Sequence, residues 1–572
     1  MVSLVAALAV LLGVAAWIGV RGWLAKGELE QVAAQKSALT EAIAAEDADA
    51  MSRAVARVHA HADRAAELTS DPLWHAMEGL PFVGPNAAAV RVTSESLRDV
   101  AAAAGPLVAA LQGEGAAPGG LDLSLLGGLH APTAAVAAAV ATADQRLAAI
   151  DVDALIAPLR HGVGDLRDAV SGAAPVLSDA AAMTGILPAI LGADGDRTIL
   201  VMVQNSAEVR TGGGITGSFI AVQAADGRLS VGVHADSSEF PRATAPVIEL
   251  PTDLTDLYGA AAGTYVTNAT MTADFDLSAR LASAWWQKIG YAPPDAVISI
   301  DPRVLAAMLR ITGPVTLSDG TAVDADHVTT QVLVEPYMEQ TQAAQTALQT
   351  DLAQRLFEQL LATPLDLAAW AGELSTPISE GRISIWSAHA DEQSVLAAGP
   401  FAGTLARYRA AGPDAVGVYF NDATTGKMDT YLETEIGVGT RSCRADGVSE
   451  VSVSVSVANT ATDVARTYPV SMAGGANPAL PGDITTDVAV AVPAGWFFGG
   501  VDVDGQPAAS YDQAAATNPT SLTRVVLSPG QSSTATFQFL TGAGDAAVEP
   551  VVIHTPMMSP VTVAPTAALP CG

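Results

Sequence analysis

An uncharged apolar run, Val2–Val20, is the first pattern along the chain and reads VSLVAALAVLLGVAAWIGV. At a rise of about 1.5 Å per residue, a helix over this run is roughly 28 Å long, close to the thickness of the hydrocarbon core of a bilayer. Trp17 and Trp23 flank its end, where aromatic rings favour the membrane interface. The run predicts a transmembrane anchor within residues 1–25 and a single-pass protein of the cell membrane.

A cleaved signal peptide is the alternative, because Gly13 and Ala15 form a small-x-small pattern inside the run. The apolar part of a signal peptide is usually only about 7–15 residues long, so the length favours an uncleaved signal anchor. Arg21 and Lys26 follow the run, and the positive-inside rule alone would place the rest of the chain in the cytoplasm. Two other features, a cysteine pair and a family resemblance, favour the opposite placement, with the bulk of the chain extracytoplasmic.

Residues 26–193 are rich in alanine and carry apolar residues at helical spacing, beginning with Leu29 and Val32. Asp71 followed by Pro72 predicts a helix start, because proline is tolerated in a first turn and aspartate caps it. We predict an α-helical stalk or bundle here. It is either a spacer that holds the distal domains off the membrane or a bundle that senses or binds a partner.

Interruptions divide this helical region. Two prolines and a glycine in Leu80–Pro85 forbid a continuous helix and predict a turn. Residues 113–128 are dense in glycine and are expected to form a loop. The helical pattern resumes at about Pro132 and continues, with breaks, to Ile190.

The pattern then changes to strands. Thr198–Val203 and Phe219–Val222 are predicted strands, and the glycine-rich run Thr211–Ser218 connects them. Asp226-Gly227 predicts a tight hairpin turn. Helical segments follow, and Asp301 before a proline predicts a helix cap, so residues 194–412 are expected to form a mixed α/β central domain.

Perfect alternation marks the C-terminal part, since Val451–Val457 places valines on one face and serines on the other. Thr486–Val492, Thr523–Leu527 and Thr534–Leu540 are further predicted strands. Several short strands separated by turns predict an antiparallel β-sandwich over residues 413–572. The fold class is therefore multidomain α+β: a transmembrane helix, a helical stalk, a mixed α/β domain and a β-sandwich.

The charge of the chain and its two cysteines restrict the possible partners and the cellular compartment. The 28 basic and 60 acidic residues give a net charge of −32, and such a polyanion is repelled by phosphate backbones, so nucleic acid is not an expected partner. Cys443 and Cys571 are the two cysteines, and they bracket the strand-rich segment. In an exported protein this pair predicts a disulfide.

Candidate chemistry is sparse. The chain lacks the GK[ST] phosphate loop, HExxH, CxxC, GxSxG and the Rossmann glycine fingerprint, so no cofactor and no metal are expected. Gly212, Gly213 and Gly214 beside Arg210 could form a backbone nest for a phosphate or carboxylate. The alternative is a glycine-rich turn between strands. We favour the turn, because one basic residue is little support for an anion site.

The run QNSAEVRTGGGITGSF, residues 204–219, resembles the signature of the bacterial family catalogued as domain of unknown function 4012. Further stretches that fit this family are Trp74 with Pro81–Gly84, Tyr265–Phe275, Val297–Pro302, Thr312–Val315, Asn421-Asp422, Gly426–Asp429 and Tyr431-Leu432. The resemblance covers most of residues 70–445. It implies a membrane-anchored protein on the secreted side of the membrane, and no particular chemistry.

The order of strands, helices and turns is also similar to the LytR-CpsA-Psr phosphotransferases, which transfer polyprenyl-pyrophosphate-linked glycopolymers to the cell wall. This resemblance implies arginines that grip pyrophosphate and an aspartate that helps to hold Mg²⁺. By position, Asp196, Arg210 and Arg242 are the candidates, although the segment lacks a dense cationic cluster.

Two functions follow as expectations. The first is a non-catalytic, membrane-anchored cell-envelope protein that binds or scaffolds cell-wall polysaccharide or envelope proteins. The second is a phosphotransferase on lipid-linked glycopolymers, which requires Asp196, Arg210 and Arg242 to converge on one cleft.

Overall fold

A computed structural model describes residues 2–45, 47–111, 116–117, 120–121, 123–363, 366–475, 479–513, 518–542 and 548–571. For Val2–Ala15 the description covers the backbone only. The chain is mixed α+β and forms two compact units. One comprises residues 1–194 and 364–369, and the other comprises residues 195–363 and 370–572.

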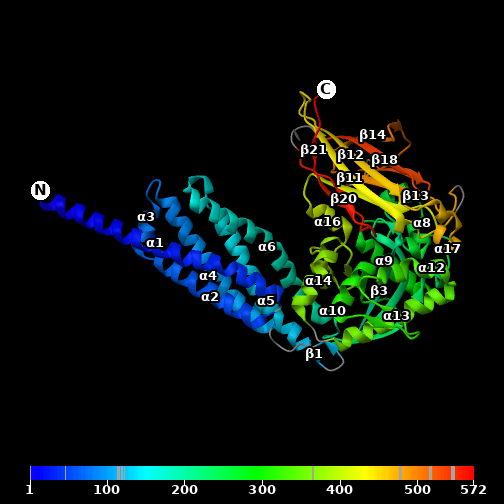
Figure 1. Cartoon of the computed structure of the whole chain (residues 1–572), viewed down its shortest axis with the longest axis horizontal. Helices are drawn as coiled ribbons and strands as arrows, with labels where there is room; N and C mark the ends of the chain where they lie inside the picture. Colours follow the sequence, from blue (N-terminus) through cyan, green and yellow to red (C-terminus); the bar gives the residue numbers. More distant parts are fainter. Residues whose placement is uncertain are drawn as a thin grey trace. The chain divides into compact units, whose positions relative to one another are not determined.

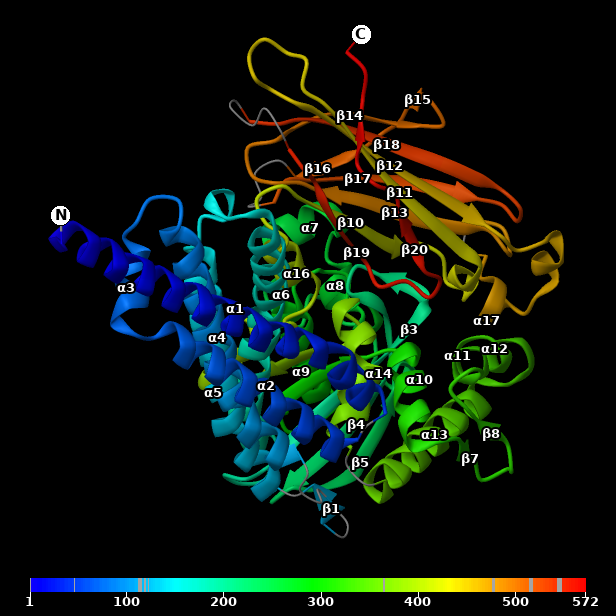
Figure 2. The ribbon, with the colours of Figure 1, turned by 60° about the vertical axis from the view of Figure 1, so that its left-hand side comes forward.

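The first unit is helical (Figure 1). Its helices are α1 (Val2–Ala44), α2 (Ala48–Thr69), α3 (Pro72–Glu78), α4 (Gly84–Leu111), α5 (Leu123–Ala148) and α6 (Ala157–Ile190). α1 packs on α2, α2 on α4, α4 on α5, and α5 on α6, so each long helix lies beside the next (Figure 2). Alanines fill these contacts, and their small side chains allow close approach of the helices.

Local signals in this unit are confirmed where a cap or a proline set them. Asp71 caps α3 by accepting from the N–H groups of Leu73 and Trp74, and Pro72 stands in the first turn. The predicted turn separates α3 from α4, although α4 already begins at Gly84. The next helix was predicted to begin at about Pro132, and this predicted start was wrong.

That helix, α5, begins at Leu123 and runs through Gly127 and Gly128 to Pro132 and beyond. Packing against α6 stabilises this glycine-containing turn, since His130 Nδ1 lies 3.1 Å from the carbonyl oxygen of Ala181. Of the loop predicted over residues 113–128, residues 113–115, 118–119 and 122 lie outside the described part of the chain.

Two helical segments in the described part, Leu126–Ala148 and Ala157–Ile190, are long and apolar enough to cross a membrane. Length and composition do not distinguish a membrane span from a helix of a bundle. The N-terminal unit therefore contains apolar helices that could anchor the protein in a membrane.

The second unit contains a five-stranded mixed sheet in the order β5-β4-β3-β6-β9. Its strands are β3 (Arg197–Arg210), β4 (Gly213–Ala225), β5 (Arg228–Asp236), β6 (Ala296–Ile300) and β9 (Ser384–Ser387). Helix α9 (Phe275–Lys288) packs on this sheet and buries Trp285 and Trp286 completely or nearly so. Burial of each such ring stabilises the unit by about 1.5–3 kcal/mol.

β3 and β4 are longer than predicted and are joined by only two residues, Thr211 and Gly212. The strands continue through the glycine run because Gly213 and Gly214 pair across the hairpin with Arg210 and Val209. The predicted turn at Asp226-Gly227 is confirmed, with both residues at positive φ.

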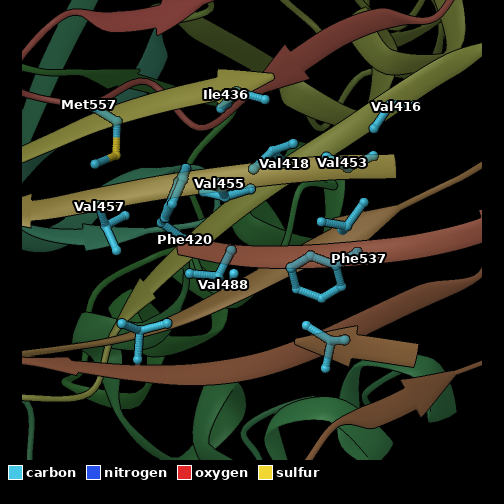
Figure 3. Packing of buried hydrophobic residues seen from close by; sticks show 14 of the residues in the cluster. Val416, Val418, Phe420, Ile436, Val453, Val455, Val457, Val488, Phe537 and Met557 are labelled. Atoms are coloured by element: carbon cyan, nitrogen blue, oxygen red, sulfur yellow. The ribbon is translucent and has the colours of Figure 1, made fainter. Parts of the chain in front are cut away.

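Two further sheets share one core in the C-terminal part (Figure 3). One has the order β16-β17-β13-β10-β19 and the other β15-β14-β18-β12-β11-β20. In β12 (Glu450–Asn459) buried valines alternate with half-buried serines, as predicted. The valines face Phe420, Val488 and Phe537 in Figure 3. The remaining bounds are β10 (Ala415–Asp422), β11 (Leu432–Arg441), β13 (Ile484–Ala491), β14 (Phe497–Val503), β15 (Gln506–Pro507), β16 (Tyr511–Gln513), β17 (Thr520–Leu527), β18 (Ser532–Leu540), β19 (Val551–His554), β20 (Val561–Val563) and β21 (Ala567–Ala568).

The strand pairing is not purely antiparallel, which corrects the prediction for this region. β19 runs parallel to β10, and β20 and β21 run parallel to β11. The C-terminal segment thus adds itself to both sheets. The predicted disulfide joins Cys443, which follows β11, to Cys571 at the end of this segment, with 5.7 Å between the Cα atoms.

Candidate functional site

Backbone N–H groups of the glycine-rich turn between β3 and β4 donate hydrogen bonds to other groups of the protein. The N–H of Thr211 donates to Asn421 Oδ1 (3.0 Å), that of Gly212 to the carbonyl of Thr270 (2.9 Å), and that of Gly214 to Gln204 Oε1 (3.1 Å). A Cβ atom at Gly214 would lie 2.3 Å from a backbone oxygen, so only glycine fits. These donors point into the protein, which favours the structural turn over the anion nest.

The three charged residues predicted to form a site do not come together. Asp196 is exposed just before β3, and Arg210 ends the same strand. At about 3.3 Å per residue, a strand of this length separates its ends by roughly 40 Å. Arg242 is exposed and lies over the ring of Tyr265, 4.9 Å from its centroid. No common site for Asp196 and Arg210 exists in this fold.

Arg210 is instead buried and held by neighbouring groups. Its Nε donates to Asn268 Oδ1 (3.1 Å), and its Nη1 donates to the carbonyl oxygens of Val209 (2.8 Å) and Asp422 (3.1 Å). The guanidinium therefore connects β3 with β10. Its side chain serves the fold at this position.

A buried ionic cluster surrounds the end of β3. We define it as Glu208, Arg210, Asp422, Lys427 and Asp429, all at most 9% exposed. Lys427 forms an ion pair with Glu208, and its Nζ lies 4.8 Å from the ring centroid of Tyr337. Asp429 Oδ2 accepts from the N–H of Val209 (2.7 Å).

The stretches that contain Asp422, Lys427 and Asp429 fit the family resemblance, but their sequence pattern predicts no role for these residues. About 210–220 residues separate them from Glu208 and Arg210, so no local spacing connects the two halves. The charged residues near the ends of the apolar strands β3 and β10 could have indicated a buried cluster, because burying a charge is costly unless it is paired.

The cluster contains three carboxyl groups and two cations. Asp422 Oδ2 and Asp429 Oδ1 are buried without a hydrogen-bond partner among the described residues. Burial raises the pKa of Asp422 to about 6, with Arg210 opposing the rise and Glu208 adding to it. Burial and the neighbouring Asp422 raise the pKa of Asp429 well above its ordinary value. One retained proton would make the cluster electrically neutral.

This proton predicts an unusual dependence of stability on pH. Because the folded pKa values of Asp422 and Asp429 are raised, their contribution to stability is complete below about pH 4 and declines at higher pH, for Asp422 as the pH rises through about 6. Asp429→Asn removes one carboxylate and keeps an oxygen that can accept from Val209. We expect the variant to gain stability over the wild type between about pH 5 and 8, measured as the difference in urea-unfolding free energy. A difference that does not change with pH would contradict the retained proton.

A cleft of about 220 Å³ lies next to this cluster, because Thr211, which follows Arg210 in the chain, lines it. Tyr258, Tyr408 and Tyr419 line it together with Asp253 and Arg409, and its other lining residues include Leu254, Leu257, Asp274, Leu277, Gln513, Asn518 and Thr520. Burial raises the pKa of all three tyrosines, in Tyr408 to about 12, so their hydroxyls stay neutral. Neutral hydroxyls, aromatic faces and a charged rim suit a polar, uncharged ligand.

No group of three or more histidine, cysteine, aspartate or glutamate side chains in the described ranges is arranged to hold a metal ion. The Mg²⁺ expected under the phosphotransferase alternative would rely on Asp196, which is exposed and separated from Arg210 by the length of β3.

Residues 194–337 match the family model described as protein of unknown function (DUF4012), and this match confirms the resemblance over that segment. No curated protein matches the chain. The matched segment includes the β3–β4 hairpin, Arg210 and Tyr337, and the cluster is completed by residues of β10 and beyond. The likeness to the LytR-CpsA-Psr phosphotransferases stays a prediction.

Proposed function

We propose that this protein is a non-catalytic cell-envelope protein, anchored by α1 in a single pass, whose second unit lies outside the cytoplasm and binds cell-wall polysaccharide in the tyrosine-lined cleft. The helical unit acts as a spacer between the membrane and the binding unit. The cleft beside Thr211 carries the proposal, because three tyrosines with neutral hydroxyls and the charged residues Asp253 and Arg409 line it.

The cysteine pair supports the placement outside the cytoplasm. Disulfides persist in oxidising compartments and are rare in the cytosol. The bond between Cys443 and Cys571 uses both cysteines of the chain. The acidic surface, with a net charge of −32, is compatible with neutral glycans or basic partners and disfavours nucleic acid.

The size and chemistry of the cleft favour sugar binding over phosphoryl transfer. Its volume of about 220 Å³ lies below the range of about 300–1,000 Å³ typical of small-molecule pockets, so its occupant is small, and we infer that it is a single sugar ring. Phosphoryl transfer requires several cations around one phosphate group. Among the described residues that line the cleft, Arg409 is the one arginine, and Arg210 is buried with other partners.

Binding of soluble oligosaccharides of N-acetylhexosamines to the full chain in detergent tests the proposal. We expect saturable binding by calorimetry, and we expect Asp253→Ala and Arg409→Ala each to weaken it by about 10- to 150-fold, because a hydrogen bond to a charged group contributes about 1.5–3 kcal/mol. Arg228→Ala is the matched control, since Arg228 is exposed in the same unit and does not line the cleft. Absence of binding, or equal loss in the control, would reject glycan binding at this cleft.

A further inference from the structure

Exposed apolar side chains gather at one end of the helical unit. Phe82 is 91% exposed and stands in the α3–α4 turn with the exposed residues Leu80 and Val83, and Ile156 is exposed immediately before α6. We define these four side chains as the apolar tip. Large exposed apolar side chains that cluster in this way mark an interaction surface.

Contacts within the unit place the tip beside the end of the apolar run of α1. Ile18 packs in one cluster with Trp74, Met77 and Ala87, and the ring of Trp74 also lies against Gly22. Trp74 belongs to α3 and Ala87 to α4, and both helices contact α1, so the turn that carries the tip connects two helices that pack on α1.

The connection between α5 and α6 reaches the same end. The N–H of Ile156 donates to Asn86 Oδ1 (2.9 Å), which ties the start of α6 to the start of α4. The four residues of the tip therefore belong to two different connections at one end of the unit, and both are next to the segment Trp17–Leu24, where the apolar run of α1 ends.

The backbone at Phe82 is in the left-handed region, with φ of +63°. A bulky residue rarely adopts this conformation. Asn86 Nδ2 donates to the carbonyl of Phe82 (2.9 Å) and helps to hold it. Because the phenyl ring is almost fully exposed, its packing does not offset the cost of this backbone conformation. The fold therefore gives no reason for phenylalanine at this position.

We propose that the apolar tip inserts into the interface of the membrane that α1 spans, and so forms a second membrane contact of the helical unit. This inference rests on the anchor in the proposed function. Aromatic and apolar side chains of peripheral elements settle about 5–10 Å into the boundary between headgroups and acyl chains.

The contact is expected to be apolar in character and independent of anionic lipid. Arg21 at the end of the run is engaged by Asp71 (3.1 Å) and by the carbonyl of Leu68 (2.7 Å). Asp151, Asp153 and Arg160 are exposed charges near Ile156, and the guanidinium of Arg160 donates to the carbonyl oxygens of Val152, Asp153 and Leu155. Insertion therefore depends on burial of side chains and not on attraction to negative headgroups.

Site-specific fluorescence in vesicles tests the tip. Because both native cysteines form the disulfide, Phe82→Cys in the full chain can be labelled alone with an environment-sensitive dye. The protein is reconstituted into phosphatidylcholine vesicles whose lipids carry a nitroxide near the head of the acyl chain. Val20→Cys reports insertion of α1. Leu111→Cys is the matched control, since this exposed leucine ends α4, roughly 40 Å along the helix from Gly84.

Strong quenching at position 82, with none at 111, is the expected result, and addition of anionic lipid leaves it unchanged. Quenching at 20 without quenching at 82 overturns the tip while the anchor stands. Absence of quenching at both 20 and 82 rejects the anchor itself and the tip with it. Equal quenching at 82 and 111 shows a helical unit lying flat on the membrane and also overturns the proposal.

A second variant separates strain from structure. Phe82→Gly suits the left-handed backbone and is expected to raise the unfolding midpoint of the protein in detergent. A lowered midpoint would show that the ring has a structural role, and the argument from strain would fail.

Discussion

Replacing Lys427 with methionine is expected to lower the free energy of unfolding by about 3–5 kcal/mol, because the change leaves Glu208 buried without its partner. The loss of a cation also brings the cluster to three carboxyl groups and one arginine. Methionine keeps much of the side-chain volume, so the cost reports charge and not a cavity. Denaturant unfolding of the purified variant measures it.

A second substitution in the same pair gives the sharper test. Glu208→Gln together with Lys427→Met removes both charges, and a buried pair replaced by neutral groups of similar size costs little. We therefore expect the double variant to recover most of the stability, which yields a large coupling energy in a double-mutant cycle. Arg310→Ala is the control, because Arg310 and Glu373 form an exposed pair worth only about 0–1 kcal/mol. A Lys427→Met variant no less stable than this control would contradict the role of the buried pair.

Removal of the disulfide is expected to destabilise the second unit by about 2–5 kcal/mol. Cys443 and Cys571 are 128 residues apart in the sequence, and closing so long a loop restricts the unfolded chain strongly. Serine at both positions also frees the C-terminal segment, whose strands β20 and β21 are short edge strands on β11. The loss is measured as a lower midpoint of thermal unfolding and as faster proteolysis after β18.

The same bond tests the compartment. Trapping of free thiols with an alkylating reagent in intact cells should leave Cys443 and Cys571 unmodified until a reductant is added. Full alkylation without reductant would show reduced cysteines in the cell and would reject the placement of this unit outside the cytoplasm. Substitution of Ser533, a buried residue of β18 that is remote from both cysteines in the sequence, by alanine controls for general destabilisation of the same sheet.

Local chemistry made parts of the fold readable from the sequence. The cap at Asp71, the turn at Asp226-Gly227 and the alternation in β12 each depend on residues within a few positions of one another. Their geometry follows from side-chain hydrogen bonds, from backbone conformations that glycine tolerates and from the two faces of a strand. The pair Cys443–Cys571 was predictable for another reason, because a chain with two cysteines allows one intramolecular disulfide.

Features of the fold that depend on segments far apart in the chain could not be predicted from the sequence. The length of α5, the parallel pairing of β19 to β21 and the two-residue turn at Thr211 are decided by packing against other elements. Arg210 illustrates the difference most directly: the sequence indicated a ligand-binding cation, and the fold buries it against the carbonyl of Asp422.

The sequence by itself determined the apolar run, the helical and alternating segments, the acidic balance and the cysteine pair, since each is a property of composition or of short-range spacing. Tertiary structure alone decided which charges share a buried cluster and which side chains line the cleft. It also brought the tip at Phe82 next to the end of the apolar run. Burial and proximity set pKa values and exposure, and both arise only when segments far apart in the chain pack together.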